Sequence, residues 1–126
     1  MKKLINTTNA PSAIGPYAQA IKSTSSNTVY VSGQLPINPE TSKMPDTIEK
    51  QTEQSLLNLK AIIEEAGSSL ENVVKTTVYL NDMNDFNHMN EVYSKFFNQP
   101  FPARVAIEVS RLPRDAKVEI DAIAIC

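Results

Sequence analysis

Two charged residues in the last quarter of the chain could do chemistry, because they interrupt segments that are otherwise apolar. Arg104 lies in the segment FPARVAIEV, and Glu119 lies in the segment AKVEIDAIAI. An arginine on a rigid strand can hold a carboxylate through two parallel hydrogen bonds from its planar guanidinium. A glutamate nearby can orient or deprotonate a water molecule. The pair therefore indicates either a site for a small carboxylate or a cross-strand ion pair with a purely structural role.

The segments that carry this pair are expected to form a β-hairpin. Apolar and polar residues alternate over 104–109 and again over 118–125, which predicts two strands. The connection SRLPRD, residues 110–115, contains a proline and suits a turn. Folding the chain at this connection would bring Arg104 and Glu119 nearly opposite each other on the same face of the sheet.

Earlier segments supply the rest of the fold. Alternation predicts strands over 28–33 and 74–80, and helical spacing of apolar residues predicts a helix after Asp46 and a second one over 86–97. Asp46 and Glu49 resemble a capping box at the start of the first helix, and Gly67 stops that helix.

The predicted order of elements is strand, helix, strand, helix and hairpin. This order indicates an α+β fold in which two helices pack on one face of a mixed sheet. The other face would carry Tyr79, Ile123 and Ile125. A contiguous apolar patch of this kind is often an oligomer interface, so we expect the uncovered face to pack against copies of the same chain.

Composition excludes several classes of function. The 126 residues suit one domain, spanning 1–126. Twelve basic and fourteen acidic residues give a net charge of −2, which argues against nucleic acid as a partner. The single cysteine, Cys126, and the single histidine, His88, exclude an internal disulfide and any metal site rich in these residues. Without an apolar leader or membrane span, we expect a cytoplasmic protein.

Four collinear segments resemble the Rid family, also called YjgF-like or reactive intermediate deaminase proteins. They are NAPSAIGPYAQA (9–20), VSGQLPINPETS (31–42), KTTVYLNDMNDFNHMNEVY (75–93) and FPARVAIEVSRLPRDAKVEIDAIA (101–124). The resemblance covers essentially the whole chain.

The resemblance implies a chorismate-mutase-like α+β fold and a homotrimer with ligand clefts between subunits. It also implies hydrolytic deamination of reactive imines and enamines to 2-oxo acids and ammonia. The substrates would be 2-iminobutanoate, 2-iminopropanoate and 2-aminoacrylate, which dehydratases release from threonine or serine. The expected partner is thus a small 2-imino or 2-oxo acid, with no metal or organic cofactor, nucleic acid or membrane.

Carried over by resemblance, Arg104 matches the carboxylate-binding arginine and Glu119 matches the glutamate associated with the attacking water. Five further positions match residues that line or approach the ligand: Tyr17, Ser32, Gly33, Asn90 and Ala106. Gly33 and Ala106 would act through their backbones, and the family's frequent Ser followed by Cys or Thr after the arginine is Val105 and Ala106 here. A role for a thiol is therefore in doubt, and the stretch 97–101 is shorter than in many members.

Two other functions remain open at this point. The same cleft could serve a non-catalytic, small-anion-binding regulatory protein. RNA cleavage or inhibition of translation is also attributed to the family, but the acidic charge balance and the single histidine argue against it.

Overall fold

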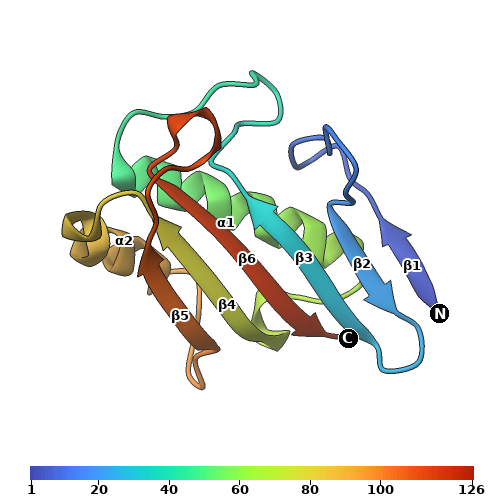
Figure 1. The fold of residues 1–126 in the computed structure, drawn as a ribbon. Coiled ribbons are helices and arrows are strands. Elements are labelled where there is room, and N and C mark those ends of the chain that lie inside the picture. The colour runs from blue at the N-terminus through green and yellow to red at the C-terminus, as the bar shows by residue number, and fades with distance from the viewer.

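Six strands form one sheet in the computed structural model, which describes residues 1–126 (Figure 1). In chain order they are β1 (Lys2–Ile5), β2 (Ala20–Ser23), β3 (Thr28–Gln34), β4 (Val73–Leu80), β5 (Ala103–Glu108) and β6 (Val118–Ile125). In space the order is β1-β2-β3-β6-β4-β5. Only the β4–β5 pair is parallel, so the sheet is mixed and the expected α+β class is confirmed.

The predicted hairpin of the last quarter is wrong. β5 pairs with β4 at the edge of the sheet, whereas β6 lies between β3 and β4 (Figure 1). In this central place β6 has hydrogen-bonding partners along both of its edges, which satisfies the backbone N–H and C=O groups of its buried positions. Alternation identified both strands correctly, but it carries no information on which strands become neighbours.

The long helix α1 (Ile48–Glu65) begins one residue later than the capping pattern predicts. Thr47, not Asp46, is the N-cap, and its hydroxyl accepts a hydrogen bond from the Lys50 N–H at 3.2 Å. The predicted stop is confirmed, because Gly67 follows the helix with a φ of +87°, a left-handed conformation that favours glycine. The inner face of α1 buries five aliphatic side chains in the core: Ile48, Leu56, Leu59, Ile62 and Ile63.

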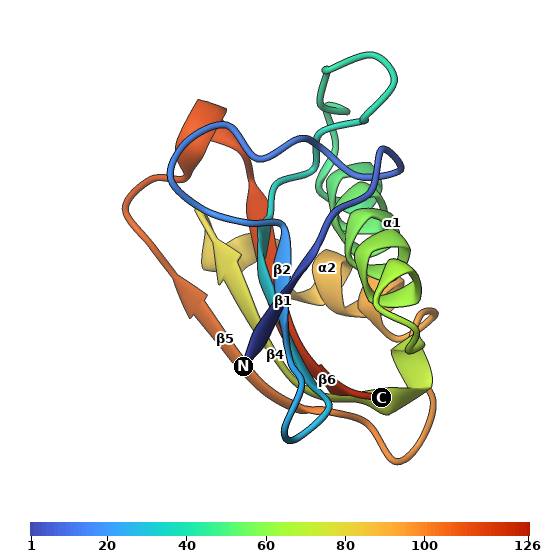
Figure 2. The ribbon, with the colours of Figure 1, turned by 90° about the vertical axis from the view of Figure 1, so that its right-hand side faces the viewer.

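The second helix, α2 (Phe86–Tyr93), packs beside α1 on the same face of the sheet (Figure 2). It follows the short 3₁₀ turn η2 (Met83–Asp85) and is shorter than the predicted 86–97, although Phe97 is still buried in the core. Neither helix has the length and apolar character that a membrane span would need.

The opposite face of the sheet has no helix over it, and we refer to it as the open face (Figure 2). The predicted apolar residues are found there: Ile125 is exposed, and Tyr79 and Ile123 are half-buried. Three further apolar side chains are exposed on the same face: Tyr30, Val105 and Ile107. That copies of the chain pack on this face stays a prediction.

Candidate functional site

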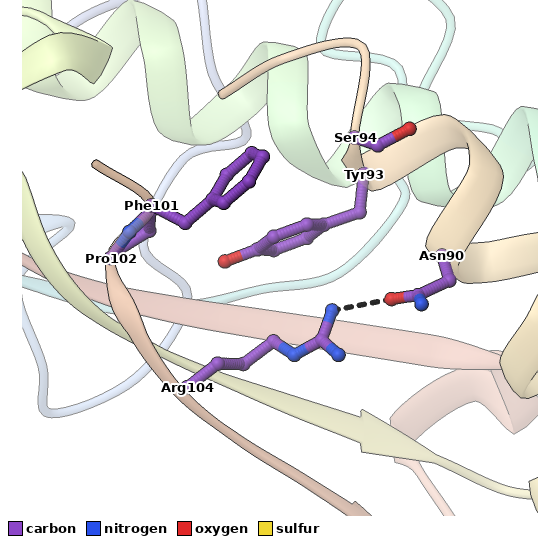
Figure 3. Close-up of a pocket in the computed structure, with 6 residues that line it drawn as sticks. All are labelled: Asn90, Tyr93, Ser94, Phe101, Pro102 and Arg104. Carbon is purple, nitrogen blue, oxygen red and sulfur yellow. Dashed lines mark hydrogen bonds between the residues drawn. The ribbon is translucent and has the colours of Figure 1, made fainter. Parts of the chain in front are cut away.

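Arg104 is a half-buried cation without an acidic partner. It lies opposite Thr76 in the β4–β5 ladder and therefore faces the helices. Its Nη1 donates a hydrogen bond to Oδ1 of Asn90 at 2.6 Å (Figure 3). The two ion pairs of the chain, His88–Glu49 and Arg111–Asp115, do not include it. An unpaired charge in a partly buried place is costly, so its free N–H groups are suited to an incoming anion.

One face of α2 holds this guanidinium. Phe86, Asn90 and Tyr93 follow each other at positions i, i+4 and i+7, so they lie on the same side of the helix. The Arg104 Cζ lies 4.8 Å from the Tyr93 ring centroid and 5.5 Å from that of Phe86, within cation–π range. The sequence pattern placed Phe86 and Tyr93 only on the apolar face of a helix, although their spacing around Asn90 was visible.

A second hydrogen bond ties Tyr93 to the sheet. Its hydroxyl lies 2.8 Å from Oγ1 of Thr76, the residue opposite Arg104 in the ladder. Burial raises the pKa of Tyr93, so this phenol keeps its proton and stays neutral beside the cation.

A cavity of about 390 Å³ opens beside the guanidinium (Figure 3). We refer to it as the Arg104 cavity, and its lining residues are Asn90, Tyr93, Ser94, Phe101, Pro102 and Arg104. Arg104 is the only charged residue among them. The volume is near the lower end for small-molecule sites, as a ligand of a few carbon atoms would require.

Glu119 belongs to a different part of the molecule. It lies opposite Tyr79 in the β4–β6 ladder and faces the open side of the sheet. Burial, followed by the negative charge of Asp121, raises the pKa of Glu119 above the ordinary carboxyl value. Tyr79 donates a hydrogen bond to Oδ2 of Asp121 at 3.1 Å. No cation pairs with Glu119, so its carboxyl group is disposed to hold a proton or exchange one with water.

Gly33 allows the Glu119 carboxylate to lie where it does. A Cβ at position 33 would come 2.5 Å from Oε2 of Glu119, far inside van der Waals contact. The β3–β6 register also shifts between Val31 and Gln34, which places an irregularity of the ladder beside this carboxylate. A glycine is therefore favoured here by the close approach of the Glu119 side chain, which would have to shift if a Cβ were added.

A cavity of about 480 Å³ lies at Glu119. We refer to it as the Glu119 cavity, and loops and strand ends supply most of its lining. The lining residues are Pro11, Ser12, Ile14, Tyr17, Gly33, Gln34, Leu35, Ile37, Pro113, Arg114 and Glu119. Its first loop is held by the buried Gln19, whose side chain accepts from the Thr7 N–H at 2.7 Å and donates to the Pro11 carbonyl at 2.7 Å.

Two more buried amides hold the loop after β3. The Asn58 side chain donates to the carbonyls of Leu35 and Ile37 at 3.0 and 2.9 Å. Gln51 donates to the Pro45 carbonyl and accepts from the Lys117 N–H, both at 2.8 Å. Helix α1 thereby positions a wall of the Glu119 cavity without contributing to its lining.

The structure divides the predicted site residues between the two cavities. Arg104 and Asn90 line one, whereas Tyr17, Gly33 and Glu119 line the other. Two predicted residues line neither cavity: Ser32 donates its hydroxyl to the Ala18 carbonyl at 2.6 Å, and Ala106 is half-buried against the core.

The expectation that Arg104 and Glu119 lie close together on one face is wrong for a single chain. β4 separates their strands, and their partners on β4, Thr76 and Tyr79, are three positions apart. Successive side chains of a strand point to opposite faces, so an odd separation places Arg104 under α2 and Glu119 on the open face.

No group of three or more histidine, cysteine, aspartate or glutamate side chains is placed to hold a metal ion. The chemistry that the residues themselves offer is anion binding at Arg104 and proton transfer at Glu119.

Comparisons with known proteins agree over almost the whole chain. A family model described as Endoribonuclease L-PSP matches residues 7–126. A RutC family protein of Pyrococcus horikoshii is 56% identical over 125 residues, which cover 98% of each chain. The 2-iminobutanoate/2-iminopropanoate deaminase of Escherichia coli (strain K12) is 49% identical over 128 residues, covering 99% of this chain and 98% of the relative. A crystal structure of E. coli TdcF with bound serine has a TM-score of 0.92 and 43% identity and covers 98% of both chains.

Proposed function

This chain belongs to the Endoribonuclease L-PSP (YjgF/RidA) family, and from that premise we propose that it deaminates reactive 2-imino acids by hydrolysis. The substrates are 2-iminobutanoate, 2-iminopropanoate and the related enamine 2-aminoacrylate, and the products are 2-oxo acids and ammonia. The observation that carries the proposal is the unpaired Arg104 cation beside a cavity of about 390 Å³. The name of the deaminase relative, and the serine held by TdcF, support a small carboxylate as the ligand class.

Arg104 binds the substrate carboxylate through two parallel N–H donors. Asn90 occupies one of the five guanidinium N–H groups, so enough donors remain for a bidentate contact. Holding the carboxylate orients the adjacent C2 atom, the electrophilic centre of the imine, toward the attacking water.

Glu119 acts as the general base and general acid of the reaction. In its ionised form the carboxylate accepts one proton from the water that adds to C2 and passes it to the imine nitrogen, which gives a carbinolamine. It then accepts the hydroxyl proton of that intermediate and passes it to the same nitrogen, so that the C–N bond breaks, the C=O bond forms and ammonia leaves. The raised pKa of Glu119 suits this exchange, because both of its protonation states are then populated closer to neutral pH. Imines hydrolyse without a catalyst, so only a modest lowering of the barrier is needed.

We further propose that the working site forms between copies of the chain, as a homotrimer with the Arg104 cavity of one protomer against the Glu119 cavity of its neighbour. Three features support this arrangement. Arg104 lies on the edge strand β5, where another copy can approach. Glu119 faces the open side of the sheet, which exposes apolar side chains. Neither Arg104 nor Glu119 has an ionic partner within its own chain, so both remain free to act on a ligand held between protomers.

The test is the wild-type protein in a coupled assay. Threonine dehydratase generates 2-iminobutanoate from threonine, and the release of ammonia is followed with and without the chain. We expect the chain to accelerate release. If it binds 2-oxobutanoate but does not accelerate hydrolysis, the regulatory alternative replaces the proposal. If it instead cleaves a single-stranded RNA probe and leaves the imine untouched, the proposed function is wrong.

A further inference from the structure

The surroundings of Arg104 contain aromatic and amide groups but no other charge. The helix face that meets it consists of Phe86, Asn90 and Tyr93, and the remaining lining of the Arg104 cavity is Ser94, Phe101 and Pro102. Arginines in partly buried positions usually pair with a carboxylate, because an uncompensated charge there is costly. Here the rings of Phe86 and Tyr93 and the amide oxygen of Asn90 take that place; Figure 3 shows Tyr93 and Asn90 beside the guanidinium.

Each neutral partner constrains a different part of the guanidinium. Ring faces attract a cation through their quadrupole and carry no carboxylate that would pair with its N–H donors. The Asn90 oxygen occupies one N–H and sets the rotation of the plane. Neither contact cancels the positive charge, whereas a carboxylate at position 90 would form an internal ion pair that competes with the ligand.

From this geometry we propose that Phe86, Asn90 and Tyr93 are positioning residues that form a charge-neutral holder for Arg104. The holder orients the guanidinium for a bidentate contact and keeps its whole charge available to a carboxylate ligand. The inference rests on the proposed function for the identity of that ligand, and it concerns how the anion is held and not how the imine is hydrolysed.

The decisive variant is Asn90→Asp, because it separates stability from function. The new carboxylate would form an ion pair with Arg104, so the folded chain should be at least as stable as the wild type. The same ion pair would occupy the guanidinium N–H groups that the anionic ligand needs. We expect the Kd for 2-oxobutanoate, measured by calorimetry, and the KM for 2-iminobutanoate to rise about tenfold or more, with Tm unchanged or higher. Asn87→Asp is the matched control, because Asn87 is exposed on the same helix and makes no side-chain hydrogen bond. Its Kd should stay within about twofold of the wild-type value.

Two substitutions of Tyr93 test the aromatic part of the holder. Tyr93→Leu removes the ring face, which is worth about 0.5–2 kcal/mol and corresponds to a rise in Kd of roughly 2- to 30-fold. Tyr93→Phe keeps the ring but loses the hydrogen bond to Thr76, so it should retain more affinity than the leucine variant. If Tyr93 only supports folding, the two variants should lose affinity in proportion to their loss of Tm, and that result would overturn its role.

The outcomes for the holder and for the deaminase activity can be told apart. An Asn90→Asp variant that binds 2-oxobutanoate as tightly as the wild type overturns the holder, whatever the imine assay gives. A wild type that binds the anion but does not hydrolyse the imine overturns the activity, while a selective loss of binding in Asn90→Asp still supports the holder.

Discussion

The two cavities hold their charged residues in opposite ways. Arg104 is held by a strand and a helix, both regular elements, and its neutral neighbours leave its charge intact. Glu119 also lies on a strand, but loops and strand ends line its cavity, and burial together with Asp121 disfavours its charged form. An anion receptor needs a permanent charge in a fixed place, whereas a group that exchanges protons needs a pKa closer to the working pH. The difference indicates that binding and proton transfer are assigned to separate parts of the chain.

The largest expected effect is at the Arg104 cavity. Arg104→Ala should lower kcat/KM for 2-iminobutanoate by about 1,000-fold, because loss of a buried, hydrogen-bonded charge partner costs about 2–5 kcal/mol. The coupled ammonia assay measures this loss. Arg111→Ala is the control, since Arg111 pairs with Asp115 on the surface and lines neither cavity. Wild-type turnover in Arg104→Ala would show that Arg104 does not bind the substrate carboxylate, and the contrast between the two cavities would be wrong.

A substitution in the Glu119 cavity should cause a smaller loss of activity, and the loss should be in kcat and not in ligand binding. Glu119→Gln keeps the shape of the side chain but cannot exchange the proton, so kcat should fall by about 100-fold. Binding of 2-oxobutanoate, followed by calorimetry, should be largely retained if the carboxylate contact is at Arg104, as proposed. Equal losses of binding in both variants would contradict the division of roles.

Mixing the two inactive variants tests whether the cavities meet between protomers. In a ring with one site at each interface, a 1:1 mixture of Arg104→Ala and Glu119→Gln chains, co-refolded, should regain about one quarter of wild-type activity. A quarter of the interfaces then combine the intact arginine of one chain with the intact glutamate of the next. Activity no higher than that of the separate variants would show that Arg104 of one protomer and Glu119 of its neighbour do not share a site.

A milder perturbation should come from Gly33→Ala. The added methyl group would meet the Glu119 carboxylate, so that side chain must shift, and kcat should fall by about tenfold. Binding of 2-oxobutanoate should change little. Ser32→Ala serves as the comparison variant. Ser32 is adjacent in the chain, lines neither cavity and donates its hydroxyl to the Ala18 carbonyl. An unchanged kcat in Gly33→Ala would show that the position of this carboxylate does not matter.

The smallest expected effect is on stability as pH changes. Because the folded-state pKa of Glu119 is raised, the folded chain binds more protons than the unfolded chain between the ordinary carboxyl pKa and the raised one. The free energy of unfolding should therefore lose this contribution as pH rises through that interval. Glu119→Gln stays neutral, so its Tm relative to wild type, followed by circular dichroism, should increase over the same interval. A constant difference in Tm would contradict a raised pKa.

Features that depend on residues close together in the sequence could be predicted well. The stop at Gly67 was predicted correctly because a left-handed residue after a helix favours glycine. The buried face of β6 was also correct, since Val118, Ile120, Ala122 and Ala124 are all buried. The error at the start of α1 was a single residue, because Asp46 and Thr47 are both good N-cap residues.

The sequence by itself determined which residues alternate, that the first helix stops at Gly67, and that an arginine and a glutamate interrupt apolar strands. These properties depend on residues within a few positions of each other. Only the tertiary structure decided that β4 lies between β5 and β6, and therefore that Arg104 and Glu119 lie on opposite faces. Strand order depends on hydrogen bonds and packing between segments far apart in the chain, and a local pattern does not record which of those contacts is the most stable.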